Sequence, residues 1–374
     1  MQKIYINARF LTQPVTGVQR YGIELVQALD TLIAENDDAV RNVAFELVAP
    51  KRGLLHRLDL KNIPLRCTGK FTGHYWEQVE LPDFVRDGLL FCPGNTAPLK
   101  SLRRQKVVVC VHSLAFRYLP EAYSRLFRTV YNQLMPKIFR HARTVITVSE
   151  SEKKYIGEHF PGAKAPVVAV QNGGISAAFR ESLVLSQSQK SAADSPYLLF
   201  VGSFSRVKNL ENVLTALHLL HRDFPKLTLR IVGAKARSFN DLSTKIDEQL
   251  RPKIVFEGQI NDTVAMIKLY QNAAALVFPS FYEASPLPPI EAMSCGCPVV
   301  ASDIPSLRER CGNTAEYCRP ESPESIATAI AAILSDAQFA EHLRQNGLAR
   351  AAEFSWERCA RETLAVFRNV LSTD

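Results

Sequence analysis

Two glutamates lie eight positions apart in the last third of the chain, after the apolar run 275–278 (Ala-Leu-Val-Phe). Pro288 and Pro289 suit the first turn of a helix, so Glu283 precedes this turn and Glu291 lies in or just after it. Carboxylates at the end of a strand can accept hydrogen bonds from sugar hydroxyls, and the helix N-terminus can face a phosphate. The alternative is a pair of surface acids that complements the helix dipole.

A second group of residues has the chemistry of a phosphate site. Gly202 follows the apolar run 197–201, and Arg206 and Lys208 come next. We expect Asn209 to cap the helix that begins after it. A strand, a glycine turn, two cations and a helix N-terminus suit a mono- or diphosphate, although a solvated loop with two surface cations fits equally. The patterns Gly-x-Gly-x-x-Gly and Gly-Lys-Ser/Thr are both missing here, so this is neither a Walker loop nor a dinucleotide fingerprint.

Both groups of residues follow strands, and strand-like runs alternate with helical patterns in both halves of the chain. The strand-like runs are 4–7, 44–48, 107–111, 144–148, 167–170, 197–201, 227–232, 254–256, 275–278 and 299–301. Helical spacing is clearest in 21–32, in 123–139 apart from the kinking Pro136, and in 210–220. This alternation predicts an α/β protein with two Rossmann-like units. Ligands of such sheets bind beyond the carboxyl ends of the strands, so we expect the units to face each other across a cleft.

A polar stretch separates the two units. Residues 186–196 read Ser-Gln-Ser-Gln-Lys-Ser-Ala-Ala-Asp-Ser-Pro, which is typical of a linker, and Asn172-Gly173-Gly174 supplies hinge residues just before it. At about 150 residues per domain, a length of 374 residues also favours two domains. The composition, 47% hydrophobic and 22% charged, argues against a disordered or low-complexity chain.

Targeting and cysteine patterns bear on where the protein works. No apolar run approaches the ~20 residues of a membrane span, and the first residues lack the pattern of a signal peptide. We therefore expect a cytoplasmic protein, with its eight cysteines reduced and mostly buried. The pair Cys295-Gly-Cys297 is spaced too closely for a usual zinc site.

Positive charge is concentrated in one half of the chain. Residues 1–172 hold 24 Lys and Arg against 15 Asp and Glu, a net charge of +9, whereas residues 173–374 hold 21 against 22, a net charge of −1. Such a field attracts anionic partners, namely a phospholipid surface, nucleic acid or a phosphorylated substrate, unless the charge is only a solvated face. The cations that could dock on an anionic leaflet are Lys100, Arg103, Arg104, Lys106, Arg125, Arg128, Lys137, Arg140 and Arg143.

Two further observations concern partners of the basic half. The segment 71–76 (Phe-Thr-Gly-His-Tyr-Trp) is aromatic and could stack on a sugar or insert into a membrane, but Trp76 could equally pack against Leu81 and Phe84. A nucleic-acid-binding protein is the rival class, given a pI near 9.0. The chain lacks an aromatic-basic RNA motif and a recognition-helix signature, so we expect no nucleic acid partner.

Several motifs, in order along nearly the whole chain, resemble a known family. The Glu-x7-Glu segment resembles the signature of family four, the retaining GT-B glycosyltransferases that include glycogen-synthase-like and bacterial lipopolysaccharide and mannosyltransferase enzymes. The segments 16–21 and 146–151 resemble the N-terminal glycine loop of that family and its serine turn before a helix, and His112 matches its active-site histidine. Residues 172–173 and 201–210 resemble its interdomain turn and its phosphate loop.

The resemblance implies domain bounds of 1–173 for an acceptor-binding domain, 174–355 for a nucleotide-sugar-binding domain, and 356–374 for a C-terminal helix that packs back on the first. It implies that Glu283 holds hydroxyls of the transferred sugar, that Glu291 holds the ribose diol, and that His112 contacts the donor sugar near its anomeric centre. The remaining residues implied to bind the nucleotide sugar are Gly17, Gly202, Ser203, Arg206, Lys208, Gly258, Gln259, Ile260, Ser285 and Leu287.

The chain also departs from the family pattern at several positions. Thr16 stands where many members have the first of two glycines, and Ser203 and Val207 stand where many have arginine, so Arg206 is a displaced candidate for that cation. The usual Glu-Gly-Phe-Gly reads Glu-Ala-Ser-Pro here, and Pro286 has no N–H to give to a ligand. The donor sugar must therefore be held somewhat differently.

The resemblance finally implies a reaction. It is a metal-independent, retaining transfer of a hexose from a nucleotide diphosphate sugar to a saccharide or lipid-linked acceptor in bacterial polysaccharide synthesis. GDP-mannose is the favoured donor and a UDP-sugar of glucose, galactose or GlcNAc the alternative. Since no Asp-x-Asp metal motif occurs in the chain, we expect no metal and no other cofactor, with Lys208 and Arg206 stabilising the leaving diphosphate. An epimerase or a phosphorylase on the same fold remains a further alternative.

Overall fold

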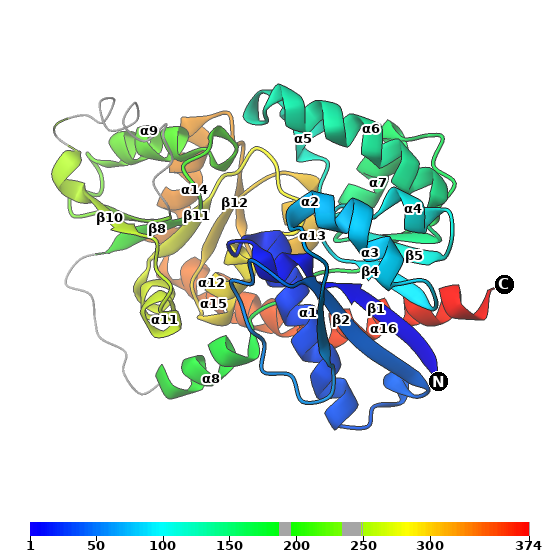
Figure 1. The fold of residues 1–374 in the computed structure, drawn as a ribbon. Coiled ribbons are helices and arrows are strands. Elements are labelled where there is room, and N and C mark those ends of the chain that lie inside the picture. Colours follow the sequence, from blue (N-terminus) through cyan, green and yellow to red (C-terminus); the bar gives the residue numbers. More distant parts are fainter. Residues whose placement is uncertain (187–195, 234–247, 249, 374) are drawn as a thin grey trace. The chain divides into compact units, whose positions relative to one another are not determined.

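The computed structural model describes residues 1–186, 196–233, 248 and 250–373, and the chain divides into two compact units (Figure 1). Unit 1 comprises Met1–Gly173 together with Ser355–Asp374, and unit 2 comprises Gly174–Phe354. Apart from its two end residues, the predicted linker 186–196 lies outside the described residues. The chain passes from unit 1 to unit 2 next to the predicted hinge glycines and returns at the start of its last helix.

Unit 1 is built on a seven-stranded sheet in the order β3-β2-β1-β4-β5-β6-β7, and neighbouring strands are parallel. The strands are β1 (Gln2–Asn7), β2 (Val43–Pro50), β3 (Leu65–Thr68), β4 (Leu89–Cys92), β5 (Lys106–Cys110), β6 (Thr144–Thr147) and β7 (Val167–Ala169). Their short apolar runs are mostly buried because helices cover such a parallel sheet. The strands β3 and β4 were not predicted, because neither Leu-Arg-Cys-Thr nor Leu-Leu-Phe-Cys is a β-branched run.

The helices of unit 1 include one that comes from the far end of the sequence. They are η1 (Ala8–Thr12), α1 (Gly17–Ala34), η2 (Asp38–Val40), α2 (Gly73–Tyr75), η3 (Trp76–Glu80), α3 (Leu81–Phe84), α4 (Leu99–Leu102), α5 (Ala115–Tyr118), η4 (Pro120–Ala122), α6 (Arg125–His141), α7 (Glu150–His159) and α16 (Trp356–Ser372). The C-terminal helix α16 packs against α1, and the rings of Phe91 and Phe367 lie 5.0 Å apart (Figure 1). Gly173 has no room for a side chain, because a Cβ there would lie 2.5 Å from the ring of Trp356.

Unit 2 repeats the same plan with a six-stranded sheet in the part of the chain that the structure describes. The order is β10-β9-β8-β11-β12-β13, again with parallel neighbours. The strands are β8 (Tyr197–Val201), β9 (Thr228–Val232), β10 (Ile254–Gly258), β11 (Ala275–Phe278), β12 (Val299–Ser302) and β13 (Glu316–Cys318). The helices are α8 (Ala177–Ser186), η6 (Arg206–Lys208), α9 (Leu210–Leu220), η7 (Arg251–Lys253), α11 (Thr263–Asn272), α12 (Pro288–Ser294), α13 (Pro305–Cys311), α14 (Pro323–Ser335) and α15 (Ala337–Ala352).

Each sheet has one position where the order of its strands changes direction. In unit 1 the chain runs outward from β1 to β3 and then returns to add β4 on the other side of β1. In unit 2 it runs outward from β8 to β10 and then returns to add β11 on the other side of β8. Loops at the carboxyl ends of two such strands diverge and leave room for a ligand. The expected fold, α/β with two Rossmann-like units, is confirmed.

Candidate functional site

The two predicted groups of residues in unit 2 meet at the change of strand order between β8 and β11. The backbone N–H of Phe281 donates to the carbonyl oxygen of Val207 at 2.9 Å, which ties the loop after β11 to the turn after β8. Across the same junction the Nζ atom of Lys208 pairs with Oε1 of Glu283. The structure therefore brings together two predicted site residues that lie 75 positions apart in the sequence.

Asn209 holds this junction in a way that the sequence did not predict. It precedes α9 as expected, but its backbone is left-handed (φ 62°) and its side chain makes no capping bond. Its Nδ2 atom instead donates to the carbonyl oxygens of Pro279 at 2.9 Å and Pro320 at 2.6 Å. The prediction of a capping side chain is wrong, because the left-handed backbone turns the buried amide toward the chain that follows β11 and β13.

Lys208 lies flat over the end of β8. A Cβ at Gly202 would lie 3.4 Å from Cγ of Lys208, so the missing side chain of the glycine leaves space for the lysine stem. The ammonium group lies 5.2 Å from the centre of the Phe278 ring. The side chains of Lys208 and Glu283 are 24% and 11% exposed. This cation is partly removed from water and is held by one carboxylate, so an incoming diphosphate could replace that carboxylate at modest cost.

Glu291 is buried and held in place by a tyrosine. Pro288 and Pro289 occupy the first turn of α12, as predicted, and Glu291 ends that turn. Its Oε2 atom accepts a hydrogen bond of 3.0 Å from the hydroxyl of Tyr270 on α11, and both side chains lie in the interior. Sequence analysis missed Tyr270, because nothing in the spacing of α11 distinguishes this ring from an ordinary core residue.

The other predicted residues of unit 2 lie on loops at the same edge of the sheet. Arg206 and Ser203 are exposed in the turn after β8, and Gly258 ends β10 with a left-handed backbone (φ 72°). Gln259 is exposed and Ile260 is half-buried just beyond β10. These loops follow neighbouring strands, since β10, β9 and β8 are consecutive in the sheet.

The loop before α12 is braced from behind by a buried arginine. Ser285 is half-buried and Leu287 is buried in this loop. The carbonyl oxygen of Pro286, between them, accepts a hydrogen bond of 3.3 Å from Nε of Arg310, a fully buried residue of α13. The guanidinium of Arg310 also lies 4.1 Å from the centre of the Phe354 ring. No sequence pattern pointed to Arg310, which follows the motif by about 20 residues.

In unit 1, His112 follows β5 and is buried in a fixed tautomer. Its backbone N–H donates to Oδ1 of Asn95 at 2.7 Å, and its ring Nε2 lies 2.7 Å from the carbonyl oxygen of Pro93. A carbonyl oxygen can only accept, so Nε2 carries the proton. Burial lowers the pKa of His112 to about 4, against the smaller effect of the bond to Pro93, which raises it. At neutral pH the ring is therefore uncharged and Nδ1 is a hydrogen-bond acceptor.

Gly17 is the first residue of α1, and nothing in the protein explains why it is a glycine. A Cβ built at this position has no neighbouring atom within 4 Å. The preceding Thr16 and Gln19 form a capping box, in which the Thr16 N–H donates to Oε1 of Gln19 at 3.1 Å. A well-capped helix N-terminus with open space beside it suits close approach of an anion, which is the role that the family resemblance implies for Gly17.

Comparison with known proteins identifies the family. Residues 15–173 match the family described as Glycosyltransferase Family 4, and residues 184–350 match the one described as Glycosyl transferases group 1. Together the two matches take in most of the chain. The chain is a glycosyltransferase, with one family match in each half.

A relative that matches along the whole chain agrees with that assignment, and solved structures of other proteins show the same fold as this glycosyltransferase. O-antigen chain mannosyltransferase B of Escherichia coli is 28% identical over an alignment of 390 residues that covers 98% of this chain and 99% of the relative. Sucrose-phosphate synthase from Thermosynechococcus elongatus has a TM-score of 0.74 at 21% identity, with all of both chains covered. Anabaena HepE, in complex with UDP and glucose, has a TM-score of 0.67 at 17% identity, covering 99% of this chain and 100% of HepE. The structural likeness shows the GT-B fold.

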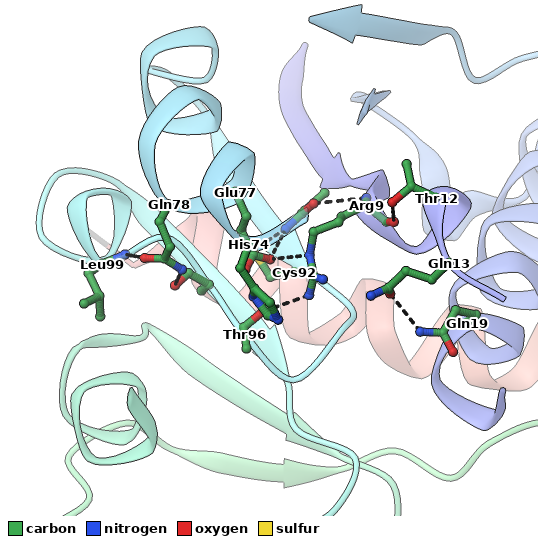
Figure 2. Close-up of polar contacts among 12 residues, drawn as sticks. Arg9, Thr12, Gln13, Gln19, His74, Glu77, Gln78, Cys92, Thr96 and Leu99 are labelled. Atoms are coloured by element: carbon green, nitrogen blue, oxygen red, sulfur yellow. Dashed lines mark hydrogen bonds and ion pairs between the residues drawn. The ribbon is translucent and has the colours of Figure 1, made fainter. Parts of the chain in front are cut away.

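Unit 1 of this glycosyltransferase holds a buried charged network that the sequence did not reveal. Figure 2 shows side chains from η1, from the segment around Trp76 and from the loop after β4 converging on the carboxylate of Glu77. Nε of Arg9 lies 3.3 Å from Oε1 of Glu77, with side-chain exposures of 7% and 1%. Sequence analysis missed both residues, because Arg9 follows a strand without any motif and Glu77 lies in an aromatic segment.

The Glu77 carboxylate is surrounded by donors. Nδ2 of Asn7 donates to Oε1 and the hydroxyl of Thr96 donates to Oε2, both at 2.7 Å. Nδ1 of His74 lies 3.3 Å from Oε2. Burial acts to raise the pKa of Glu77, but the charge of Arg9 and the side-chain hydrogen bonds outweigh it and hold the pKa at about 2. The carboxylate is therefore ionised and accepts from every neighbour.

Several smaller expectations can also be compared with the structure of the glycosyltransferase. Trp76 is fully buried and donates from Nε1 to the carbonyl oxygen of Thr68 at 3.1 Å, so it packs in the interior, whereas Phe71 and Tyr75 are exposed. Ser149 caps α7, in agreement with the serine-turn motif. All eight cysteines are free thiols, seven of them buried, as expected.

The described residues contain neither a cluster of metal ligands nor a membrane-spanning helix. Within the described ranges of the chain, no group of three or more His, Cys, Asp or Glu side chains could hold a metal ion. None of the helices that the structure describes is long and apolar enough to cross a bilayer.

Proposed function

We propose that this glycosyltransferase moves a hexose from a nucleotide diphosphate sugar to a saccharide or lipid-linked acceptor in bacterial cell-surface polysaccharide synthesis. The observation that carries the proposal is the Lys208–Glu283 pair at the change of strand order of unit 2, where a cation for phosphate and an acceptor for sugar hydroxyls lie in contact. The full-length similarity to an O-antigen mannosyltransferase supports GDP-mannose as the donor. A UDP-sugar is the alternative, and HepE, a protein with the same fold, binds UDP.

In this proposal the residues of unit 2 bind the donor. Lys208 and Arg206 neutralise the diphosphate, with Gly202 and Ser203 in the same turn. Glu283 accepts hydrogen bonds from the transferred sugar and Glu291 from the ribose diol. The base lies against the backbone of residues 258–260, and the loop 285–287 closes the sugar side. Arg310 and Tyr270 act indirectly, since the first holds a carbonyl of that loop and the second holds the Glu291 carboxylate.

Charge development explains why cations are needed. Positive charge builds at the anomeric carbon while the leaving diphosphate gains negative charge, so fixed cations that contact the diphosphate lower the barrier. Lys208, Arg206 and the N-terminus of α9 provide positive charge, which supports metal-independent transfer. We propose that the configuration at the anomeric carbon is retained, with a donor phosphate oxygen taking the proton of the acceptor, so that no protein nucleophile is required.

Unit 1 contributes Gly17 and His112 to the proposed reaction. The N–H groups at the start of α1 approach the diphosphate, which the open surface beside Gly17 permits. His112 contacts the donor sugar through Nδ1, which accepts a hydrogen bond from a sugar hydroxyl because Nε2 donates to Pro93. A neutral histidine adds no positive charge beside the anomeric carbon, where positive charge develops.

A thermal-shift panel of GDP-, UDP- and ADP-sugars, with a duplex oligonucleotide as a further arm, tests the proposal. A ligand at about 100 times its dissociation constant adds about 2.7 kcal/mol to stability, so the true donor should raise the melting temperature by several degrees. Transfer with that donor should continue in EDTA, and the anomeric configuration of the product should match that of the donor by NMR. Stabilisation by the oligonucleotide alone would contradict the proposal and favour the nucleic-acid alternative.

Peripheral membrane association is a second part of the proposal. Helix α6 carries several cations and no acid, and its Leu126 and Val130 are 75% and 48% exposed on the same face. An exposed apolar pair among cations suits an anionic leaflet. Lys100 and Lys106 are less available, since the first pairs with Asp83 at 2.6 Å and the second donates to carbonyls at the end of α16. Flotation with phosphatidylglycerol vesicles at physiological salt tests the membrane association, and absence of binding would contradict it.

A further inference from the structure

The Arg9–Glu77 network lies where the sheet of unit 1 offers a ligand site. Arg9 follows β1 and Thr96 follows β4, the two strands between which the strand order changes direction. The corresponding position of unit 2 holds the proposed donor site. A ligand of unit 1 is therefore expected at this network on topological grounds alone.

The network leaves hydrogen-bonding groups unused on one side. The Glu77 carboxylate is saturated, but Arg9 uses only Nε, toward Glu77, and Nη2, which donates to Thr96 at 3.2 Å. The other terminal nitrogen, Nη1, has no hydrogen-bond partner among the described residues, although Arg9 is only 5% exposed. Nη1 is not one of the fully buried side-chain atoms that lack a partner, so it reaches solvent, and a ligand oxygen that replaces water there would gain a charge-assisted hydrogen bond.

Gln13, directly after η1, provides a second hydrogen-bond donor, because its side chain is oriented by a hydrogen bond from Gln19. Oε1 of Gln19 accepts from the Thr16 N–H, so its Nε2 is the atom that donates to Oε1 of Gln13 at 2.8 Å. The orientation of both amides follows, and the Nε2 group of Gln13 is left with two N–H donors. In Figure 2 the side chains of Arg9 and Gln13 project from neighbouring parts of this segment.

His74 adds an acceptor at the rim. Since the ionised Glu77 can only accept, Nδ1 of His74 carries the proton of that contact, and in the neutral form of the ring Nε2 has a lone pair. The His74 side chain is 55% exposed, so this nitrogen is accessible. The network therefore offers two donors and one acceptor, which are the groups that a sugar hydroxyl needs, because a hydroxyl donates once and accepts twice.

The charges of the network decide what kind of ligand fits. Arg9 and Glu77 cancel each other, and their separation of 3.3 Å keeps the carboxylate close to anything that binds Arg9. A phosphate at Nη1 would meet a carboxylate that stays ionised, and like charges at such short range repel. A neutral polyhydroxylated ring has no such penalty.

We propose that Arg9, Gln13 and His74 form the binding site for an uncharged sugar residue at the end of the acceptor, with Glu77 and Thr96 as positioning residues that hold Arg9 and His74. Nη1 of Arg9 and Nε2 of Gln13 donate to ring hydroxyls, and Nε2 of His74 accepts from one. This deepens the proposed function, on which it rests, by naming the residues and the chemical class of acceptor. The sugar can belong to a free oligosaccharide or to a lipid-linked one.

The experiment is ligand-observed NMR on the full chain without nucleotide, so that it does not depend on transfer. The probes are methyl α-glycosides of mannose, glucose and galactose, with mannose 6-phosphate as the charged probe. We expect at least one methyl glycoside to bind. Arg9→Lys keeps the charge beside Glu77 but removes Nη1, and it should weaken binding about 10- to 100-fold, as expected for loss of a charge-assisted hydrogen bond. His74→Ala should weaken binding about 2- to 10-fold.

Controls separate this site from a structural role. His159→Ala, at another exposed histidine of unit 1, should leave glycoside binding unchanged. His74 is a surface residue, so His74→Ala can be tested even if Arg9→Lys does not fold. Both variants should bind the GDP- or UDP-sugar with the affinity of the wild type. With whichever donor is active, saturation by free and by lipid-linked acceptors distinguishes the two sources.

Three results would overturn the inference: no glycoside binds, both variants bind glycoside like the wild type, or mannose 6-phosphate binds more tightly than every neutral glycoside in an Arg9-dependent way. Failure of the proposed function looks different. In that case no nucleotide sugar binds or is consumed, while glycoside binding stays dependent on Arg9 and His74.

Discussion

The two sheets place a charged pair at the same topological position, but the pairs differ in burial and in number of partners. Arg9 and Glu77 are almost completely buried, and side chains of neighbouring segments also bind the carboxylate. Lys208 and Glu283 are partly exposed, and the lysine otherwise contacts only an aromatic ring among its described interactions. A buried, saturated pair is expensive to break, whereas a partly exposed pair can exchange one partner for a ligand.

In the proposed function, this difference gives the two sites separate tasks. We propose that the pair in unit 2 changes partner when a diphosphate arrives, so that its charge becomes available to the leaving group. We propose that the pair in unit 1 stays intact and acts through the hydrogen bonds that it leaves unused. On this proposal, the same αβ plan would bind an anion in one unit and a neutral sugar in the other.

The largest expected difference between the two pairs is in stability. Glu77→Ala leaves the Arg9 charge buried without its carboxylate and should lower the free energy of unfolding by about 3–5 kcal/mol. Glu283→Ala should lower it by less than about 1 kcal/mol, because Lys208 can turn toward water. Urea unfolding followed by tryptophan fluorescence reports on unit 1, which contains both tryptophans, and circular dichroism reports on both units. Equal losses of unfolding free energy in Glu77→Ala and Glu283→Ala would contradict the proposed difference between the two charged pairs.

Removing the cation of unit 2 should affect the rate most. Lys208→Ala should lower kcat about 10²- to 10³-fold, because the leaving diphosphate loses a fixed positive charge in the transition state. The free energy of unfolding should change little. Lys268→Ala, at an exposed lysine of α11 in the same unit, is the matched control and should keep normal turnover. Normal turnover of Lys208→Ala would refute the role given to this lysine.

Tyr270→Phe sharpens the account of unit 2 without removing a charge. Loss of the hydroxyl that donates to Glu291 frees the carboxylate to turn away from the ribose, so the KM for the nucleotide sugar should rise about 10-fold while kcat is retained. Tyr197→Phe is the matched control, since its hydroxyl donates to the carbonyl oxygen of Leu269 at 2.7 Å. If both variants raise KM equally, general loosening of the unit explains the effect.

Gly17→Ala should have the smallest effect on stability. Nothing in the protein crowds a Cβ there, and alanine favours a helix over glycine by up to about 1 kcal/mol, so stability should stay the same or rise. Binding of the nucleotide sugar should nevertheless weaken several-fold, because the methyl group occupies the space of the diphosphate. Gly157→Ala in α7 also meets no atom within 4 Å and should stabilise without any change in binding. Unchanged binding in Gly17→Ala would remove this residue from the site.

Sequence reasoning worked where a motif and a strand end coincide. The alternation of elements gave the α/β class, and the spacing of Glu283 and Glu291 around two prolines placed both acids correctly relative to α12. Lys208 was selected as a candidate because it follows a glycine at a strand end, and the structure pairs it with Glu283. These features are local, so a single stretch of sequence contains them completely.

The missed features depend on contacts between distant segments. Arg9 and Glu77 are 68 positions apart, and neither lies in a recognisable pattern. Tyr270 looks like an ordinary core residue, and no pattern distinguishes Arg310, until the fold shows what their polar atoms contact. Asn209 was assigned to a local cap, although its amide donates to carbonyl oxygens 70 and 111 positions away. Long-range polar partners of this kind cannot be inferred from spacing.

The most direct test of the account is calorimetric titration of wild type and Lys208→Ala with GDP and with UDP. We expect wild type to bind one of the two nucleotides, and Lys208→Ala to bind the same nucleotide about 10- to 100-fold more weakly, as for loss of a charge-assisted contact. Equal affinities in the two proteins, or no binding of either nucleotide to the wild type, would contradict the claim that Lys208 leaves Glu283 to hold a diphosphate.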